Sequence, residues 1–339
     1  QHAIELGATL YVPATHNKLW EIAQGMLYPE LKSMVICLED AVLEQDLERA
    51  LLNLKQFLLK TQFADVQHPV HVFIRPRNTE IAEKVLVWQL NRSFCGFVLP
   101  KFTLHTAQTW QQILPAELQY MPTLETAEYF DTGYLLETKQ YLQQEFVPVL
   151  CLRIGANDLL SCLHLRRPKH VTVYDTPIAQ LMQQILGMFI PAGFQLSAPV
   201  FEHIERPELL EKELELDTLH GLLTKTAIHP TQVSLIHQAY RVRHDELADA
   251  EQILQHIPYQ PESTSVTTSA IDSFYAGQGV CQDHAHVFIA MCRALQLPAR
   301  YVSGYLYDQN QPHLASHAWA EVFVENEWYC FDISNQIFT

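Results

Sequence analysis

Short apolar runs alternate with amphipathic stretches from residue 8 to residue 230, and this alternation constrains the fold more than any other feature. The runs are typical of buried β-strands, whereas segments such as 47–60 repeat apolar residues at helical spacing. Strands that alternate with helices predict a parallel sheet, and eight strands are the number that closes a (β/α)8 TIM barrel. An open, doubly wound sheet fits the same alternation. The eight runs cover residues 8–13, 34–39, 70–76, 96–102, 119–125, 149–155, 196–201 and 222–230.

The character of the sequence changes near residue 255. Residues 256–268 are rich in Pro, Ser and Thr, a composition that is typical of a linker. We therefore expect the barrel over residues 1–255 and a small α+β module over residues 269–339. An apolar helix and three strands rich in aromatic and β-branched residues are expected in that module, at 280–297, 299–307, 317–324 and 327–333.

Charge and cysteine content limit the classes of partner. The chain has 22 Lys and Arg residues against 38 Asp and Glu residues, and its net charge is −16. A negative field of this kind repels nucleic acid and anionic lipid, so we expect neither as a partner. The seven cysteines form no C-x-x-C pair, which favours reduced thiols in a cytoplasmic protein. No apolar run approaches the ~18 residues of a membrane-spanning helix.

Ionisable residues follow most of the apolar runs at their C-terminal ends. In a TIM barrel these ends meet at one rim, where active sites lie. Acids and bases gathered on one rim therefore favour an active site, although a ring of structural ion pairs would use the same residue types. The residues concerned are Asp40, Arg75, Lys101, Glu125, Asp158 and His229.

Seven motifs follow one another in order along the barrel segment. They are LYVPATHNKLW (10–20), VICLEDAV (35–42), FIRPRN (73–78), VLPK (98–101), LETAE (124–128), GANDLL (155–160) and AIHPTQV (227–233). Over residues 1–254 the chain thereby resembles the HpcH/HpaI aldolase and citrate lyase β-subunit family. The resemblance implies a TIM barrel that makes or breaks a carbon–carbon bond beside a carboxylate or thioester, usually with Mg²⁺.

The same resemblance assigns roles to individual residues. It implies that Mg²⁺ or Mn²⁺ is held by Glu125 and Asp158, and that Arg75, or else Arg77, binds the substrate carboxylate. It places two further rim residues, Asp40 and Lys101, near the metal or its water, whereas His229 is expected to be a structural hydrogen-bonding residue. The chemistry is consistent, because Mg²⁺ prefers oxygen ligands and can stabilise the enolate that forms beside a broken C–C bond.

A thiol, an imidazole and a carboxylate lie in the C-terminal segment. Cys281 opens the expected apolar helix, where the partial positive charge of the helix start favours the thiolate. His317 begins one expected strand and Asp332 lies in the next, so adjacent strands would allow the two to hydrogen-bond. Nucleophile, base and orienting carboxylate would then be present. The other six cysteines, Cys292 and Cys330 among them, are expected in apolar runs or helix interiors as small hydrophobic residues.

Three stretches around these residues resemble the transglutaminase-like superfamily over residues 262–339. They are GQGVCQDHAHVFIAMCRALQLPARYVSGYL (277–306), SHAWAEVFV (316–324) and WYCFDISN (328–335). The resemblance implies a papain-like module that transfers or hydrolyses acyl groups at amide bonds through a thioester, without metal. It assigns the catalytic roles to Cys281, His317 and Asp332. His284 and His286 are two residues apart on a helix and face different ways, so they are not expected to form a metal pair.

These observations lead to a first functional hypothesis and two alternatives. The first is a Mg²⁺-dependent C–C lyase or aldolase for a small carboxylate-bearing substrate, a 2-oxo acid or an acyl thioester, fused to a thiol module for a protein or peptide. The second is a cysteine-dependent acyl-transfer enzyme that uses the barrel as a scaffold. The third is a non-catalytic metabolite-binding or assembly protein. A homo-oligomer formed through the barrel is expected.

Overall fold

The computed structural model of the chain divides into two compact units, residues 1–241 and residues 242–339. The end of the expected barrel segment, 241–255, and positions 256, 262, 266 and 267 of the expected linker lie outside the described residues. The boundaries expected from composition therefore stay a prediction. The residues that the structure describes are 3–64, 68–240, 257–261, 263–265, 268–294, 297–305, 316–324, 327–335 and 337–338.

The first unit is an eight-stranded parallel sheet that curves into a TIM barrel, one of the two folds that fit the alternation and the one that the family resemblance implies. Its strand order is β7-β6-β5-β4-β3-β2-β1-β8, so the first and eighth strands pair with each other. A bridge between Ala198 and Lys225 brings the end of β7 beside β8, which excludes the open sheet. The strands are β1 (Ala8–Pro13), β2 (Ser33–Cys37), β3 (His71–Arg75), β4 (Gly96–Leu99), β5 (Gln119–Leu124), β6 (Leu152–Ile154), β7 (Leu196–Ser197) and β8 (Lys225–Ala227).

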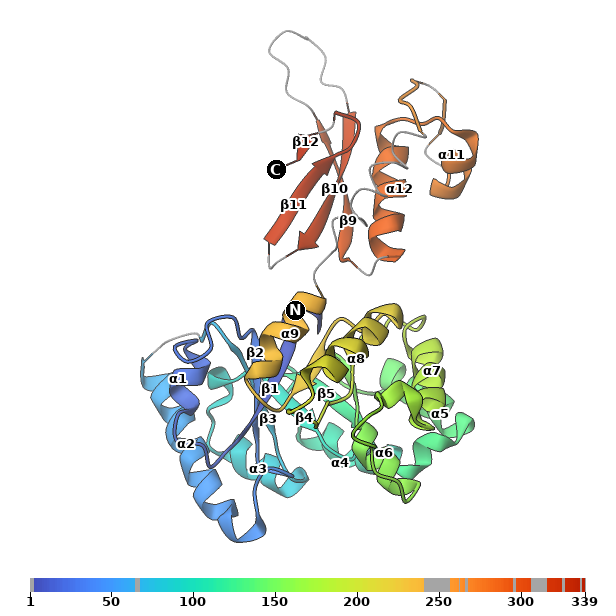
Figure 1. Cartoon of the computed structure of the whole chain (residues 1–339). Helices are drawn as coiled ribbons and strands as arrows, with labels where there is room; N and C mark the ends of the chain where they lie inside the picture. The colour runs from blue at the N-terminus through green and yellow to red at the C-terminus, as the bar shows by residue number, and fades with distance from the viewer. Residues whose placement is uncertain are drawn as a thin grey trace. The chain divides into compact units, whose positions relative to one another are not determined.

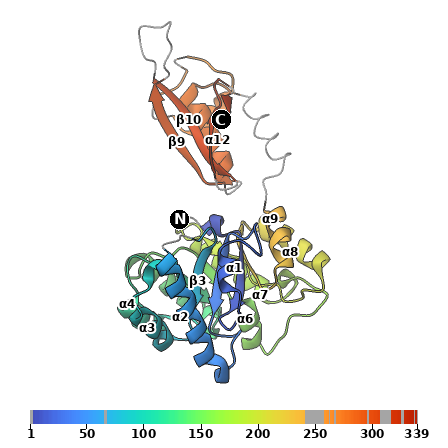
Figure 2. The same ribbon diagram turned by 90° about the vertical axis from the view of Figure 1, so that its left-hand side faces the viewer.

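Helices cover the outside of this barrel (Figures 1 and 2). Each buries one face; in α2 the buried residues Ala50, Leu54 and Leu58 recur at helical spacing. Local capping fixes where several helices begin. The Asn78 side chain, for example, accepts a hydrogen bond of 3.0 Å from the backbone N–H of Ile81 at the start of α3. The helices are α1 (Leu19–Ala23), α2 (Leu47–Ala64), α3 (Thr79–Val87), α4 (Leu104–Ile113), α5 (Thr132–Gln144), α6 (Ala156–Cys162), α7 (Ile178–Phe189), α8 (Pro207–Leu219) and α9 (Thr231–Ala239).

The interior of the barrel changes from apolar to polar along the strands. A layer of side chains from β2 to β6 packs together with Ala3 and Leu6 of the short helix η1 (Ala3–Leu6), which precedes β1. Side chains two residues further along a strand face the same side. The next layer therefore holds polar groups, among them Arg75 and Arg153, just below the C-terminal rim. The apolar layer consists of Val35, Phe73, Val98, Met121 and Cys151.

A buried network of charges joins α8 to β8. Lys225 Nζ, fully buried, lies 3.0 Å from Glu213 Oε1 and 2.8 Å from Asp217 Oδ2. Arg167 extends the network, with Nη2 2.7 Å from Glu213 Oε2 and Nη1 2.8 Å from Glu202 Oε2. Both cations of this network are thus paired with carboxylates of the same chain, which is the condition under which buried charges are tolerated.

The second unit packs one long helix against a four-stranded antiparallel sheet. The sheet order is β12-β11-β10-β9, and α12 contacts β9 and β10 (Figure 1). Phe288 and Ile289 of α12 form its core with Ala320 and Val322 of β10. The fourth strand was not expected from the sequence, and residues 295–296 and 306–307 of the expected elements lie outside the described residues. The elements are α11 (Ala270–Ala276), α12 (Cys281–Ala294), β9 (Ala299–Tyr305), β10 (Ser316–Val324), β11 (Glu327–Asp332) and β12 (Ile337–Phe338).

None of the helices in the described ranges is long and apolar enough to cross a membrane.

Candidate active sites

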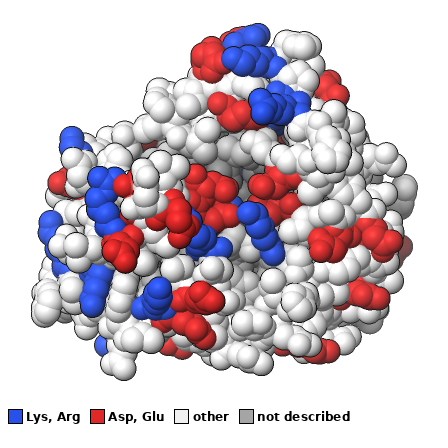
Figure 3. All heavy atoms as spheres, turned by 90° about the horizontal axis from the view of Figure 1, so that it is seen from below, with Lys and Arg blue, Asp and Glu red and all other residues white. Residues whose placement is uncertain are grey.

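Side chains from successive strands converge on the C-terminal rim of the barrel. Arg75 is the last residue of β3, and its Nη2 contacts Glu39 Oε2, lies 3.1 Å from Asp40 Oδ2 and lies 3.7 Å from Glu125 Oε1. Lys101 Nζ lies 3.4 Å from Glu39 Oε1. These groups follow strands β2 to β5, so the rim gathers four strand ends into one cluster. The face opposite the N-terminus is hollowed near its centre, with acidic and basic side chains around the hollow (Figure 3).

Two backbone features hold Glu125 in this cluster. The backbone N–H of Lys101 donates a hydrogen bond of 2.6 Å to Glu125 Oε1, and Lys101 has a φ of +45°, a left-handed conformation that side chains rarely adopt. Gly155 lies against the other side of the Glu125 side chain. A Cβ at Gly155 would come within 2.5 Å of Glu125 Oε2, so only glycine fits at this position.

Burial and mutual repulsion shift the protonation of the rim carboxyls. Burial, together with the nearby Asp158 and Glu39, raises the pKa of Glu125 to about 7, although Arg75 and the Lys101 N–H act in the opposite direction. Burial and the negative charge of Asp40 raise the pKa of Asp158, which also shares a hydrogen bond with the Glu125 carboxyl. The two carboxyls are therefore adjacent and unfavourable together as anions, an arrangement that a bound cation relieves.

The donor set of this cluster fits Mg²⁺. Both Glu125 and Asp158 offer oxygen, and Mg²⁺ is commonly held by one or two carboxylates while substrate and water complete its octahedral shell. No group of three or more His, Cys, Asp or Glu side chains with metal-binding geometry occurs among the described residues. Two carboxylates, rather than a complete protein cage, are thus what the rim provides.

The thiol, imidazole and carboxylate expected in the second unit occupy helix and sheet ends. Cys281 is the first residue of α12 and is partly exposed. His317 Nε2 lies 2.8 Å from Asp332 Oδ2, because β10 and β11 pair antiparallel with Ala320 opposite Phe331. Both side chains are buried, and the pair leaves His317 Nδ1 for a proton from a nucleophile.

The start of α12 is fixed by Asp283, which the sequence analysis did not single out. Asp283 is 1% exposed. Its Oδ2 accepts a hydrogen bond of 2.8 Å from the Val280 N–H, and its Oδ1 accepts one of 2.9 Å from the Ser273 hydroxyl. A Cβ at Gly279 would lie 2.8 Å from the Asp283 Cβ, so this capping arrangement needs glycine there. The cap defines the turn that presents Cys281 at the helix start.

Two family models match the chain, and their matches overlap over residues 238–272. Residues 1–272 match the family model of C–C bond lyases of the TIM-barrel fold. The chain belongs to this family. Residues 238–333 match the model of the transglutaminase-like superfamily. Both of the resemblances stated from the sequence motifs are therefore confirmed.

Two mycobacterial relatives with similar sequence bear the name of uncharacterised proteins. A Mycobacterium leprae protein is 29% identical over 140 residues, 38% of this chain and 50% of the relative. A Mycobacterium tuberculosis protein is 37% identical over 203 residues, 54% of this chain and 62% of the relative. The chain thus spans less than two thirds of the length of these curated relatives.

Solved structures share the fold of the lyase barrel at low identity. CitE from Mycobacterium tuberculosis, in complex with magnesium, acetoacetate and coenzyme A, matches with a TM-score of 0.57 at 19% identity, covering 80% of this chain and 96% of that chain. The citrate lyase β subunit from the same organism, complexed with oxaloacetate and magnesium, matches with a TM-score of 0.52 at 18% identity. The match covers 70% of this chain and 97% of that chain. RipC from Yersinia pestis matches with a TM-score of 0.54 at 17% identity, and the match covers 72% of this chain and 99% of that chain. At identities of 17–19%, the structural likeness shows a shared fold and nothing more specific.

Two of the residues named from the sequence lie outside the rim cluster. Arg77 Nη2 donates a hydrogen bond of 2.6 Å to the Val42 carbonyl, and its guanidinium contacts Glu44. Arg77 therefore holds the loop after β2 in place. His229 is half-buried, and its Nδ1 lies 2.8 Å from the Thr231 hydroxyl. The cluster therefore brings together Arg75, Asp40, Lys101, Glu125 and Asp158 with one further carboxylate, Glu39.

His284 and His286 of α12 have different surroundings. His284 lies 2.9 Å from the Ser334 hydroxyl and 2.8 Å from the Ile257 carbonyl, whereas His286 stacks on Tyr301 with ring centres 4.7 Å apart. The two imidazoles thus have separate partners. Asn335, which the sequence analysis missed, donates a hydrogen bond of 2.8 Å to Asp332 Oδ2 and so supports the pair of His317 and Asp332.

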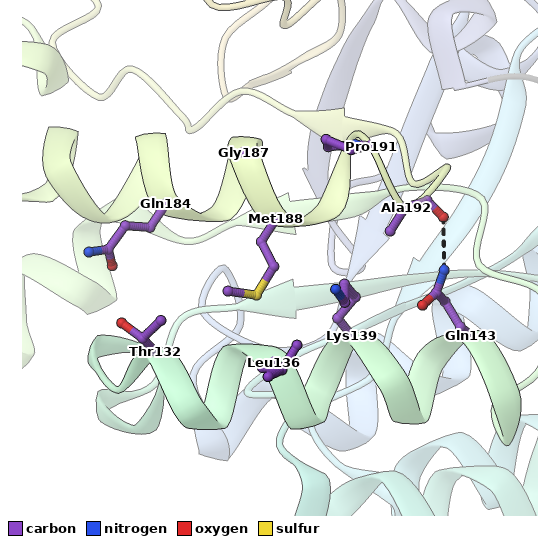
Figure 4. A pocket seen from close by; sticks show the side chains of 9 residues that line it. All are labelled: Thr132, Leu136, Lys139, Gln143, Gln184, Gly187, Met188, Pro191 and Ala192. Atoms are coloured by element: carbon purple, nitrogen blue, oxygen red, sulfur yellow. Dashed lines mark hydrogen bonds between the residues drawn. The ribbon is translucent and has the colours of Figure 1, made fainter.

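A hollow of about 580 Å³ lies elsewhere, in the groove between α5 and α7 (Figure 4). It is lined by side chains such as Leu136 and Met188, and Lys139 is its single ionisable residue. Gln143 closes one end by donating a hydrogen bond of 3.1 Å to the Ala192 carbonyl. A groove with one ionisable group lacks the acid–base and metal-binding side chains that the rim has, so we place the barrel site at the rim.

Proposed function

We propose that the lyase-family barrel is a Mg²⁺-dependent C–C bond lyase or aldolase that acts on a small carboxylate-bearing substrate, a 2-oxo acid or an acyl thioester. The observation that carries this proposal is the meeting of Glu125 and Asp158 beside the Arg75 guanidinium. Two adjacent carboxyls supply oxygen ligands for a divalent ion, and the guanidinium supplies a partner for a carboxylate.

The residues of the chain have separable tasks in this reaction. Arg75 binds and orients the substrate carboxylate, and Glu39 and Asp40 hold its guanidinium in place. The Lys101 N–H and the bare backbone of Gly155 keep the Glu125 side chain aimed at Asp158. Bound Mg²⁺ would supply Lewis-acid stabilisation of the negative charge that develops on the substrate oxygen as the C–C bond breaks.

The solved neighbours support the proposal at the level of chemistry. CitE and the citrate lyase β subunit are described in complexes that contain magnesium together with acetoacetate or oxaloacetate. A barrel of the same fold with two rim carboxylates and a rim arginine suits ligands of that class.

Calorimetric titration of the full chain with Mg²⁺ or Mn²⁺ tests the proposal. We expect one site in the unsubstituted protein, and loss of that binding in the Glu125→Gln/Asp158→Asn double variant. Glu83→Gln, at an exposed position of α3, is the matched control and should bind normally. Arg75→Met should keep metal binding but weaken pyruvate binding by more than about tenfold, the value of a lost charge-assisted hydrogen bond. Equal metal binding by the double variant and the unsubstituted protein would contradict the assignment.

A second candidate function is favoured by the 2.8 Å contact between His317 and Asp332. In an acyl transfer, His317 would take the thiol proton of Cys281 while the sulfur attacks an amide carbonyl carbon. The C–N bond would break as His317 returns that proton to the leaving amine. Water or a second amine would then cleave the thioester, releasing the thiol. Asp332 holds His317 in the orientation that these steps need.

A further inference from the structure

A second guanidinium lies inside the barrel, just below the rim. Arg153 belongs to β6 and is 2% exposed. Its Nη2 donates a hydrogen bond of 2.8 Å to the Thr226 hydroxyl, and its Nη1 lies 3.3 Å from the Met121 sulfur. Its guanidinium carbon is 5.5 Å from the centre of the Tyr11 ring. Within the described part of the chain, Arg153 forms no ion pair with a carboxylate.

This lack of a counter-charge distinguishes Arg153 from other buried arginines of the barrel. Arg167 pairs with two carboxylates, and Arg75 lies beside three. A buried, unpaired charge is strongly unfavourable, so such groups are normally paired or bind a ligand of opposite charge. The Nε atoms of all three arginines are buried without a hydrogen-bond partner, so the missing carboxylate is what sets Arg153 apart. The hydroxyl of Thr123, which lies opposite Arg153 in the register of β5 and β6, is also buried without a partner.

Arg153 shares an aromatic neighbour with the proposed carboxylate-binding arginine. The guanidinium carbons of Arg75 and Arg153 lie 5.8 Å and 5.5 Å from the centre of the same Tyr11 ring. They can be no further apart than the sum of those two distances, which is within the span of one small molecule. Burial raises the pKa of Tyr11, so its hydroxyl stays neutral and does not supply the missing negative charge.

We propose that Arg153 binds a second anionic group of the substrate, so that the barrel selects small acids with two anionic groups over those with one. The inference rests on the proposed function, because it takes the first carboxylate to be held at Arg75. The second group is a carboxylate or a phosphoryl group, which a guanidinium binds by the same charge-assisted hydrogen bonds. Thr226 holds the Arg153 side chain in the direction of that group.

A matched pair of ligands tests the proposal on the Mg²⁺-saturated full chain. 2-Oxoglutarate and 2-oxopentanoate have the same number of carbons and differ in whether the far end is a carboxylate or a methyl group. Calorimetry should show at least about tenfold tighter binding of the diacid, the value of a charge-assisted hydrogen bond to a buried cation. Phosphonopyruvate, measured alongside, shows whether a phosphoryl-type group is preferred to the carboxylate.

Substitution then assigns the preference to a residue. Arg153→Met should remove the preference for the diacid while binding 2-oxopentanoate within about twofold of the unsubstituted protein, because Arg75 is intact. Thr226→Val, which keeps the charge but removes its hydrogen-bond partner, should weaken the preference and serves if Arg153→Met does not fold. Arg49→Met, at an exposed arginine of α2, is the control and should change nothing.

The outcomes separate this inference from the function on which it rests. Equal affinity of the unsubstituted protein for all three ligands overturns the role of Arg153 and leaves the carboxylate site at Arg75 standing. A preference for the diacid that survives in both Arg153→Met and Thr226→Val overturns it as well. Failure of every ligand to bind a chain that does bind Mg²⁺ contradicts the proposed substrate class, and the inference fails with it.

Discussion

The barrel rim and the thiol site differ in how far the chain completes them by itself. At the rim, Glu39, Glu125 and Asp158 all have a pKa raised chiefly by burial, and neighbouring carboxylates raise each of them further. At the thiol site, His317 faces Asp332, which also accepts a hydrogen bond from Asn335. The rim therefore has an excess of carboxyl groups that a bound cation would stabilise, whereas at the thiol site the proposed base His317 already has a carboxylate partner in the chain.

The two kinds of cluster affect the stability of the folded protein differently. At the rim, carboxyls outnumber the two cations Arg75 and Lys101, and such an excess of one charge destabilises the fold until a ligand binds, which is a common compromise at functional sites. In a buried cluster with both signs of charge, removing one partner destabilises the fold strongly, because it leaves an uncompensated buried charge. Substitutions in the two kinds of cluster should therefore change stability in opposite directions.

The largest effect is expected in the buried network that the chain completes by itself. Lys225→Met leaves Asp217 and Glu213 buried without their shared cation. Removal of one partner from a buried ion pair costs about 3–5 kcal/mol, so the free energy of unfolding should fall by that amount in urea titrations. Lys84→Met, at an exposed position of α3, is the control. A loss below about 1 kcal/mol would show that the network is no more stabilising than a surface ion pair.

At the rim of the metal-free protein, a substitution is expected to raise the free energy of unfolding instead of lowering it. Glu125 has a pKa of about 7 when folded and about 4.5 when unfolded. Between these values the folded state holds a proton that the unfolded state has lost, so stability should fall as pH rises from 4.5 to 7. Glu125→Gln should remove this fall and stabilise the chelator-treated protein by about 1–3 kcal/mol at pH 8. An unchanged pH profile of unfolding in Glu125→Gln would contradict the charge crowding at the rim.

A smaller effect, in reactivity, distinguishes the thiol site from the other cysteines. The expectation that all six other cysteines are enclosed is wrong for Cys162, which is exposed at the end of α6. Cys281 begins a helix and Cys162 ends one, so the helix dipole favours the thiolate only at Cys281. We therefore expect Cys281 to react with iodoacetamide about tenfold faster than Cys162 at pH 7, measured by peptide mapping after brief labelling.

A matched variant sharpens that measurement. His317→Ala should slow the labelling of Cys281 near pH 7 without changing that of Cys162. Burial raises the pKa of Cys151 to about 11 and that of Cys292 to about 12, so both should remain unlabelled in the folded protein. Labelling of Cys281 that is no faster than that of Cys162 would show that the second unit has the motifs of its superfamily without the reactive thiol.

The barrel and its rim were predictable because their signals are local. Hydrophobic periodicity places each strand, and parallel strands that close a barrel must bring their C-terminal ends to one rim, so Glu125, Asp158 and Arg75 could be placed at that rim from sequence. Their separate roles there came from the family resemblance. The choice of Arg75 as the strand residue agrees with the alternation of side chains along β3. Arg77, two residues later, has already left the strand and turns to the Val42 carbonyl.

The residues that could not be predicted depend on contacts between distant segments. Arg153 and Lys225 lie in short apolar runs, and nothing in their local sequence shows that one lacks a counter-charge while the other has two. Asn335 supports Asp332 only because the turn after β11 brings it back. Gly155 is a similar case, since its need for a bare backbone arises from Glu125 on a different strand.

The central claim is that the rim is completed by one divalent cation between Glu125 and Asp158. Crystals of the full chain grown with Mn²⁺ and measured for anomalous scattering locate that cation directly. We predict one strong peak within coordination distance, about 2–2.5 Å, of an oxygen of each carboxylate, and no such peak in the Glu125→Gln/Asp158→Asn variant. A strong peak at another site, or an unsubstituted protein with none at the rim, would contradict it.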